Sequence, residues 1–245
     1  MPFRLLTVEQ VAERLHLGVR EVEHLVQRGD IPCTDRGGKP AFVQREVDAW
    51  ASQRMLGLKA APAAAHHAAS TARRRRQAAV DERLVPRLFR VEGLDPHLAA
   101  RTKPAALRAM VALAAATDLL YDDAGLLRGL EERERLCSTA VESGVAFLHT
   151  RYHDSNLCGD SFAVLGRTVQ PIFAGAADGR ATDLFFLLCC RDDALHLHAL
   201  SRLCAMAHAT TLLADLRAAD TAADLYAALL KGEEAVLHGM PVARR

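Results

Sequence analysis

The sequence predicts an α/β protein with a mixed sheet flanked by helices, preceded by a small, mainly helical domain. Short apolar runs bounded by Gly, Asp or Ser are typical of strands, and they are mixed with longer periodic segments typical of helices. Residues 57–77 are alanine-rich, lack apolar periodicity and contain four consecutive arginines, so they divide the chain. We therefore expect a helical domain at 1–55, a linker at 56–81 and an α/β domain at 82–240.

The first helix of the N-terminal domain is expected within residues 7–17. Thr7 can cap this helix, and Gln10, three residues later, is the side chain that reaches back to complete a capping box. Apolar residues recur at spacings of three and four and so share one face of the helix; they are Val8, Val11, Ala12 and Leu15.

A second short helix follows a turn at Gly18, and Gly29 is expected to end it. Its expected apolar face consists of Val19, Val22 and Val26. Two short amphipathic helices joined by a tight turn form a helix-turn-helix pattern.

A hairpin and a third helix complete the N-terminal domain. Gly37 and Gly38 can turn the hairpin, and the segment "REVDAW" begins a helix that offers Val47 and Trp50 to the same core. The segments "LLTVEQVAERL" and "LVQRGDIPC…GKPAFVQREVDAW" resemble the excisionase-like branch of the MerR-type winged helix-turn-helix family over residues 4–54. The resemblance implies DNA binding, with the second helix in the major groove.

The C-terminal domain contains both kinds of element. Helices are expected at 103–120, 123–136, 193–209, 210–219 and 222–237. Strands are expected at 144–150, 161–169 and 181–190. This mixture predicts a sheet covered by helices.

Composition excludes several classes of function. The chain of 245 residues has a net charge of +1, which predicts no overall attraction to nucleic acid or to acidic membranes. No apolar run approaches the roughly 20 residues that span a bilayer, and the N-terminus soon turns polar, so we expect a cytoplasmic protein. Six cysteines lack CxxC spacing, which favours reduced, buried thiols over a zinc site. We expect no metal and no organic cofactor.

Two histidines lie where a strand ends and where a helix begins. His149 ends the run "GVAFLH", and by spacing alone it is either a structural histidine or a reactive one. In the helix from 193, His196 shares a face with Leu200 and Leu203, so it is expected to point inward, whereas His198 is not. His196 is then either a core histidine with a hydrogen-bond partner or a neighbour of His149.

Two separated motifs indicate what these histidines do. The segments "RERLCSTAVESGVAFLHTR" and "ATDLFFLLCCRDDALHLHALSRL" resemble the enzyme IIA domain of the fructose/mannitol/nitrogen-regulatory class in the bacterial phosphoenolpyruvate-dependent phosphotransferase system, over residues 84–237. The resemblance implies that His149 accepts a phosphoryl group from a histidine-phosphorylated carrier protein. It also implies that His196 and Arg133 are active-site residues.

The residue types suit phosphoryl transfer. A neutral imidazole with a pKa near ~6.5 can attack a phosphorylated donor, and an arginine can stabilise the charge on the phosphoryl oxygens. Ser138 and Thr139 are candidate hydrogen-bond donors to the same group. Three positions depart from the family's pattern, namely Cys137, Leu148 and Thr150. The family's usual proline before the histidine is replaced by leucine, so the alternative is a non-phosphorylated adaptor that keeps the fold. Another alternative is an enzyme IIA that passes phosphate to a separate sugar-specific IIB protein.

The charge of the N-terminal domain gives only weak support for DNA binding. Acidic residues, among them Glu21 and Glu23 on the second helix, slightly outnumber the basic ones. The candidate DNA-binding residues are Arg20, His24, Arg36 and Lys39. Arg73 to Arg76 in the linker either contact phosphates or form a solvated linker with no partner. DNA and regulatory proteins are therefore possible partners, and the sequence leaves the oligomeric state open.

Overall fold

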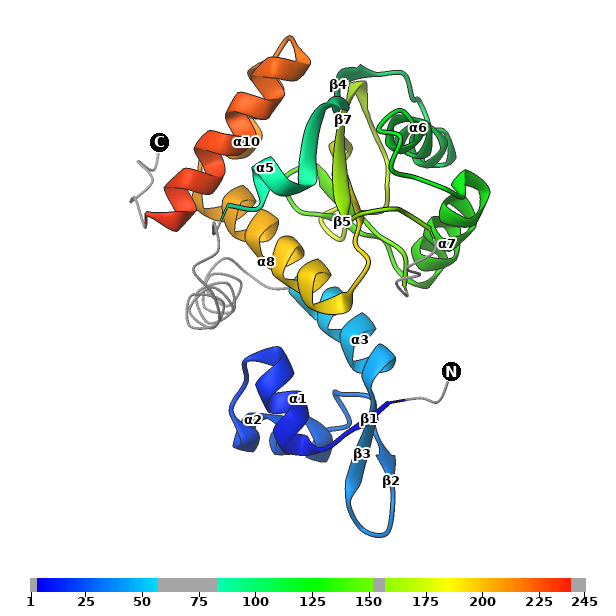
Figure 1. The fold of residues 1–245 in the computed structure, drawn as a ribbon, viewed down its shortest axis with the longest axis vertical. Helices are drawn as coiled ribbons and strands as arrows, with labels where there is room; N and C mark the ends of the chain where they lie inside the picture. The colour runs from blue at the N-terminus through cyan, green and yellow to red at the C-terminus, as the bar shows by residue number, and fades with distance from the viewer. Residues whose placement is uncertain (1–3, 57–82, 152–156, 239–245) are drawn as a thin grey trace.

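The computed structural model describes residues 4–56, 83–151 and 157–238 (Figure 1). We call residues 4–56 the N-terminal module and residues 83–238 the C-terminal module. The linker predicted at 56–81, with its arginine run, lies almost wholly outside the described residues, so the domain boundaries stay predictions.

The N-terminal module is a helix-turn-helix followed by a hairpin and a third helix, as predicted. Its elements are β1 (Leu5–Leu6), α1 (Val8–Leu15), α2 (Val19–Gln27), β2 (Thr34–Asp35), β3 (Pro40–Val43) and α3 (Gln44–Leu56). The three strands form one antiparallel sheet in the order β1-β3-β2. The β2–β3 hairpin projects away from the rest of the molecule (Figure 1).

Local signals account for the ends of the first two helices. The Thr7 side chain accepts a hydrogen bond from the Gln10 backbone, and the Gln10 side chain accepts one from the Thr7 backbone, so the predicted capping box is confirmed. Helix α2 ends before Gly29, whose φ of 69° suits glycine. The predicted face of α2 was partly wrong: Val22 is buried, but Val19 is 42% exposed, because it is the first residue of the helix.

The hairpin follows from its two glycines. Gly37 and Gly38 have φ values of 66° and 79°, which side chains other than glycine rarely adopt. The backbone groups of Arg36 and Lys39 bond to each other across these two residues, with N···O distances of 2.9 and 3.4 Å. A two-residue turn of this kind matches the twist of the flanking strands, so the predicted turn is confirmed.

The C-terminal module is a mixed sheet flanked by helices. Its helices are α5 (Val85–Leu88), α6 (Lys103–Ala115), α7 (Asp123–Leu136), α8 (Asp193–Ala209), α9 (Leu212–Ala218) and α10 (Ala222–Leu237). Its strands are β4 (Phe89–Leu98), β5 (Ala140–Val141), β6 (Val145–Leu148), β7 (Phe162–Ile172) and β8 (Thr182–Cys189). Among the described helices, none is long and apolar enough to cross a membrane.

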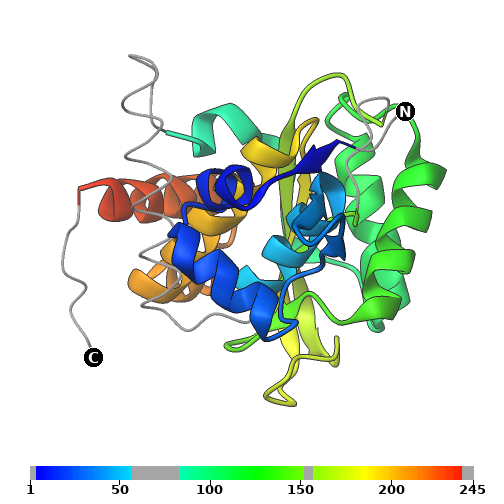
Figure 2. The same cartoon turned by 90° about the horizontal axis from the view of Figure 1, so that it is seen from below.

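Three layers make up this module. The sheet has the order β4-β7-β8-β6-β5, in which β4 is parallel to β7, β6 is parallel to β8, and β7 is antiparallel to β8. Figure 2 shows α6 and α7 on one side of the sheet and α8 and α10 on the other. Alternate residues serve the two cores: Phe147 and Phe186 pack with α8, whereas Leu148 and Leu187 pack with α6 and α7.

Helix α8 is buried between the sheet and the N-terminal module. Helix α3 packs against it (Figure 1). Apolar residues of the N-terminal module also join those of α8 in one hydrophobic cluster. All residues from Leu195 to Met206 are consequently buried. The expectation that His198 points away from the core was therefore wrong, because its side chain is only 5% exposed. Periodicity predicts one buried face, whereas α8 is covered on several.

Candidate functional site

The two histidines singled out in the sequence meet at one end of the sheet. His149 directly follows β6, and β8, which is parallel to β6, leads through Asp192 into α8 and His196. The carboxyl ends of parallel strands lie at the same edge of a sheet, which explains the meeting. The ring centroids of His149 and His196 are 4.9 Å apart. The structure thus brings the predicted pair together, while their chemical roles stay predictions.

The backbone of β6 orients the His149 ring. Its Nδ1 atom lies 2.8 Å from the Phe147 carbonyl oxygen. Because a carbonyl only accepts hydrogen bonds, Nδ1 carries the proton in this arrangement, and in the neutral ring Nε2 holds the lone pair.

The site is closed to solvent. His149 is 2% exposed and His196 is 1% exposed. Such exclusion of water strengthens electrostatic interactions within the site. It also means that neither ring is accessible to another protein in this conformation.

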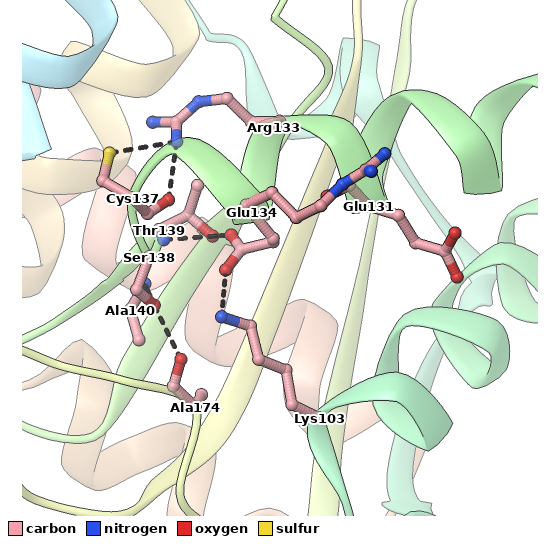
Figure 3. Close-up of polar contacts among 10 residues, drawn as sticks. Lys103, Glu131, Arg133, Glu134, Cys137, Ser138, Thr139, Ala140 and Ala174 are labelled. Atoms are coloured by element: carbon pink, nitrogen blue, oxygen red, sulfur yellow. Dashed lines mark hydrogen bonds and ion pairs between the residues drawn. The ribbon is translucent and has the colours of Figure 1, made fainter.

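Helix α7 and the loop after it form a second wall. A Cβ atom built on Gly129 would lie 2.9 Å from the Thr150 Cγ2 atom, so α7 passes directly over the residue after His149. Arg133 lies one helical turn further along α7, is 4% exposed, and donates from Nη1 to the Cys137 carbonyl oxygen at 2.8 Å (Figure 3). Within the described residues its Nη2 atom is buried and has no hydrogen-bond partner.

The register of β5 brings the Cys137 loop beside His149. Ala140 pairs with Ala146, and the Phe147 amide donates to the Thr139 carbonyl at 3.1 Å. Continuing this antiparallel register by two residues sets Cys137 opposite His149. Arg133 is bonded to Cys137, so its guanidinium is attached to this loop, while its predicted place beside the histidines stays a prediction.

Ser138 and Thr139 hold the loop in place. The Ser138 hydroxyl donates to the Ala174 carbonyl at 2.7 Å and accepts from the Ala140 amide at 3.1 Å (Figure 3). The Thr139 hydroxyl donates to the Glu134 carboxylate. Both hydroxyl hydrogens are therefore engaged with other protein groups, and their predicted role as donors to a phosphoryl group stays a prediction.

Sequence analysis missed the ion pair behind this loop. Glu134 accepts from the Thr139 amide at 2.9 Å and pairs with Lys103 at 2.5 Å, so it ties the start of α6 to the end of α7 (Figure 3). Glu134 directly follows Arg133 in the charged run "EERER", where neighbouring charges gave no signal to distinguish it.

The departures from the family's pattern are accommodated by packing. Leu148 is 1% exposed, and it continues the pairing of β6 with β8 at Leu187, where a proline would lack the amide hydrogen. Thr150 is 9% exposed, and its methyl group lies against Gly129. Both substitutions are thus built into the core beside His149.

A charged cluster joins the two modules next to this site. Arg14 of α1 binds Asp48 of α3 with two hydrogen bonds of 2.5 and 2.8 Å, and its Nη2 atom lies 3.6 Å from the Asp193 carboxylate at the start of α8. The pKa of Asp48 is raised to about 6, because burial and the neighbouring Asp193 carboxylate together raise it more than Arg14 lowers it. No sequence spacing predicted this cluster.

The predicted DNA-binding residues lie on the surface of the N-terminal module. Arg20 and His24 are exposed on α2, and Arg36 and Lys39 are exposed at the tip of the hairpin. Glu21 and Glu23 are exposed on the same helix. Both the candidate DNA-binding side chains and the acidic side chains that would repel DNA are therefore on the surface.

The cysteines differ in part from expectation. Cys158, Cys189, Cys190 and Cys204 are buried, whereas Cys33 is exposed and Cys137 is half-buried, so the expectation of buried thiols was wrong for these two. Burial raises the pKa of Cys204 to about 12, which keeps it protonated. Within the described residues no group of three or more potential ligands is placed to hold a metal ion.

Comparison with known protein families gives one match for each module. Residues 87–232 match the model of a family described as "Phosphoenolpyruvate-dependent sugar phosphotransferase system, EIIA 2". The chain belongs to this EIIA 2 family. Residues 5–55 match a helix-turn-helix domain family. No curated protein matches the chain in sequence.

Solved structures confirm the EIIA 2 fold. The nitrogen regulatory protein IIA-Ntr from Neisseria meningitidis is 21% identical, with a TM-score of 0.55 over 60% of this chain and 99% of that one. IIA mannitol from Escherichia coli is 14% identical, with a TM-score of 0.50 over 58% of this chain and 98% of that one. A complex of enzyme IIA mannitol and phosphorylated enzyme IIB mannitol from Escherichia coli matches at 13% identity, with a TM-score of 0.50 over 58% and 97%.

Proposed function

We propose that this EIIA 2 family protein is a phosphotransferase-system regulator in which His149 accepts a phosphoryl group from a histidine-phosphorylated carrier protein. The state of His149 then modulates binding of DNA or of a protein partner by the helix-turn-helix module. The observation that carries the proposal is the His149 ring, whose Nδ1 atom lies 2.8 Å from the Phe147 carbonyl oxygen and whose centroid lies 4.9 Å from that of His196.

The transfer step uses the groups of this site. The Nε2 lone pair of His149 attacks phosphorus in line, the donor's phosphorus–nitrogen bond breaks, and its electron pair returns to the donor imidazole. The Nδ1 proton stays on His149, hydrogen-bonded to the Phe147 carbonyl oxygen, and a donor histidine that is protonated on its second ring nitrogen leaves as a neutral imidazole. The product carries about two negative charges, which a buried arginine and an imidazole donor can stabilise. The Nη2 atom of Arg133 supports that role, because it is buried and has no hydrogen-bond partner among the described residues.

A labelling experiment tests the site. The full chain is incubated with phosphoenolpyruvate and the general phosphotransferase proteins, and incorporated phosphate is located by mass spectrometry. We expect label in the wild type, none in His149→Ala, and wild-type labelling in His208→Ala, which removes an exposed histidine from the same helix as His196. Equal labelling of His149→Ala would refute the assignment, and ³¹P–¹⁵N NMR should place phosphorus on Nε2.

The adaptor alternative has one observation in its favour, namely the closure of the site. If the wild type takes up no label from any carrier protein, the chain is an adaptor that retains the fold. Transfer to a separate IIB protein is the other alternative. It draws on the solved complex of IIA mannitol with phosphorylated IIB mannitol, and chase of the label onto IIB proteins tests it.

DNA binding by the N-terminal module rests on the exposed basic residues of α2 and the hairpin. Titration with mixed genomic DNA at two salt concentrations tests it, because phosphate contacts weaken as salt rises. Arg36→Ala combined with Lys39→Ala should reduce both the affinity and its salt dependence. If the wild type shows no salt-dependent binding, the module docks onto proteins instead.

A further inference from the structure

Helix α8 carries His196 on one side and the docked N-terminal module on another. We infer that the docked module holds the first turn of α8 over His149, so that a phosphoryl donor reaches His149 only after the module has left α8. This inference rests on the proposed function and concerns the regulation of the same site. It assigns the α3–α8 contact a role beyond joining the two modules.

The contact is built from one face of α3. Asp48, Ser52 and Met55 are each at most 4% exposed, and their spacing puts them on a common face. Asp48 interacts with Asp193 of α8, so this face is the one turned toward α8. Apolar residues of both modules form one cluster, which gives the contact a hydrophobic part in addition to its charges.

The charged part of the contact is closest to the active site. Arg14 lies between Asp48 of its own module and Asp193, the first residue of α8. Asp193 precedes His196 by less than one helical turn. Movement of the first turn of α8 would therefore move His196 relative to His149.

The closed arrangement does not permit transfer between proteins. In-line attack needs the reacting atoms about 3–3.5 Å apart, yet His149 and His196 are 2% and 1% exposed. A donor histidine cannot approach Nε2 of such a side chain, so the acceptor state must differ from the docked one. The N-terminal module contributes no strand to the five-stranded sheet, so it can dissociate from α8 while leaving that sheet intact.

The coupling works in both directions. If the undocked state accommodates phosphorylated His149 better at equilibrium, phosphorylation favours undocking by the same factor, because equilibrium linkage is reciprocal. The physical reason is that about two negative charges and a phosphoryl volume must fit into a site with almost no exposed surface. Phosphorylation thus releases the module, whose α2 and hairpin can then engage a partner as a mobile unit.

Asp193→Lys in the full chain provides the sharpest test. The change sets two like charges against each other across the contact, while the Arg14–Asp48 pair inside the N-terminal module stays intact. Asp123→Lys is the matched control, because Asp123 is also the first residue of a helix that follows an aspartate N-cap, and it is exposed. Far-UV circular dichroism and urea unfolding confirm that both variants fold.

The first readout needs no phosphoryl donor. Diethylpyrocarbonate acylates accessible histidine nitrogens, and mass spectrometry locates the product. We expect His149 to react roughly fivefold faster or more in Asp193→Lys, at the lower end of typical coupling strengths, and at the wild-type rate in Asp123→Lys. Small-angle X-ray scattering should show a longer maximum dimension in Asp193→Lys.

The second readout is the initial rate of phosphorylation by the carrier protein, expected to rise by a similar factor. The inference would be overturned if the modules separate in Asp193→Lys but His149 is acylated at the wild-type rate. It would also be overturned if the modules stay docked and His149 becomes equally reactive in Asp193→Lys and Asp123→Lys. Faster acylation with no phosphorylation in any variant would support the gating contact and refute the proposed function. The two hypotheses therefore fail in distinguishable ways.

Discussion

At the scale of single residues, the neighbours of His149 set its chemistry. The Phe147 carbonyl selects the nitrogen that carries the proton, and Thr150 packs against α7. The sequence predicted that His149 and His196 lie together. It did not predict the hydrogen bond to the Phe147 carbonyl or the contact of Thr150 with α7, because both depend on the backbone path at the end of β6. Threonine after the histidine is tolerated because Gly129 leaves space for it.

Gly129→Ala should therefore destabilise the protein. Alanine usually stabilises a helix relative to glycine, but here the new methyl group would lie 2.9 Å from the Thr150 Cγ2 atom. We expect a net loss of about 1–2 kcal/mol in the free energy of unfolding, as for other overpacked sites. Urea unfolding measures it. Thr150→Ser removes that methyl group, so the double variant should recover most of the loss; if it recovers none, the contact is not the cause.

At the scale of elements, helix ends set by neighbouring residues were predictable, whereas the burial of a helix that is covered on several faces was not. The capping box of α1 and the glycine turn of the hairpin rest on neighbouring residues, and both were confirmed. Strand β4 was not predicted, because its exposed and buried residues do not alternate and it contains Gly93 and Pro96. The orientation of His198 was wrong because α8 is covered by elements distant in the sequence.

The Arg202–Glu233 pair shows how such a helix is secured. The two side chains are each 1% exposed and 2.8 Å apart, and Glu233 also accepts from the amides of Leu84 and Val85 at 2.6 and 3.0 Å. Glu233 thereby joins α10, α8 and the start of α5. Glu233→Ala should lower the free energy of unfolding by about 3–5 kcal/mol, because it leaves a buried cation without its carboxylate.

Lys231→Ala is the matched control for that prediction on the same helix. Lys231 pairs with Asp215 at the surface, and its side chain is 66% exposed. Removing an exposed pair should cost about 1 kcal/mol or less. Similar losses in Glu233→Ala and Lys231→Ala, measured by thermal and urea unfolding, would show that the buried pair does not secure these elements.

At the scale of the whole molecule, the contact between the modules joins Arg14, Asp48 and Asp193, which lie far apart in the sequence. No periodicity or motif spans such separations, which is why the sequence indicated two modules but not their attachment. The family resemblance likewise concerns each module separately. The ion cluster at this contact nevertheless leaves a signature in the pH dependence of stability.

That signature comes from Asp48, whose pKa is raised from 3.8 to about 6, mainly by burial. The Asp48 carboxylate therefore binds a proton more tightly in the folded protein than in the unfolded chain. The resulting stabilisation is fully present below pH ~4 and is lost as the pH rises through ~6. We expect the free energy of unfolding of the wild type, relative to Asp48→Asn, to increase as the pH is lowered from 7 to 5. Urea unfolding across this range measures the difference, and Asp123→Asn, at an exposed position, should keep the wild-type profile. A difference between the wild type and Asp48→Asn that is independent of pH would show that Asp48 does not titrate at the contact between the modules.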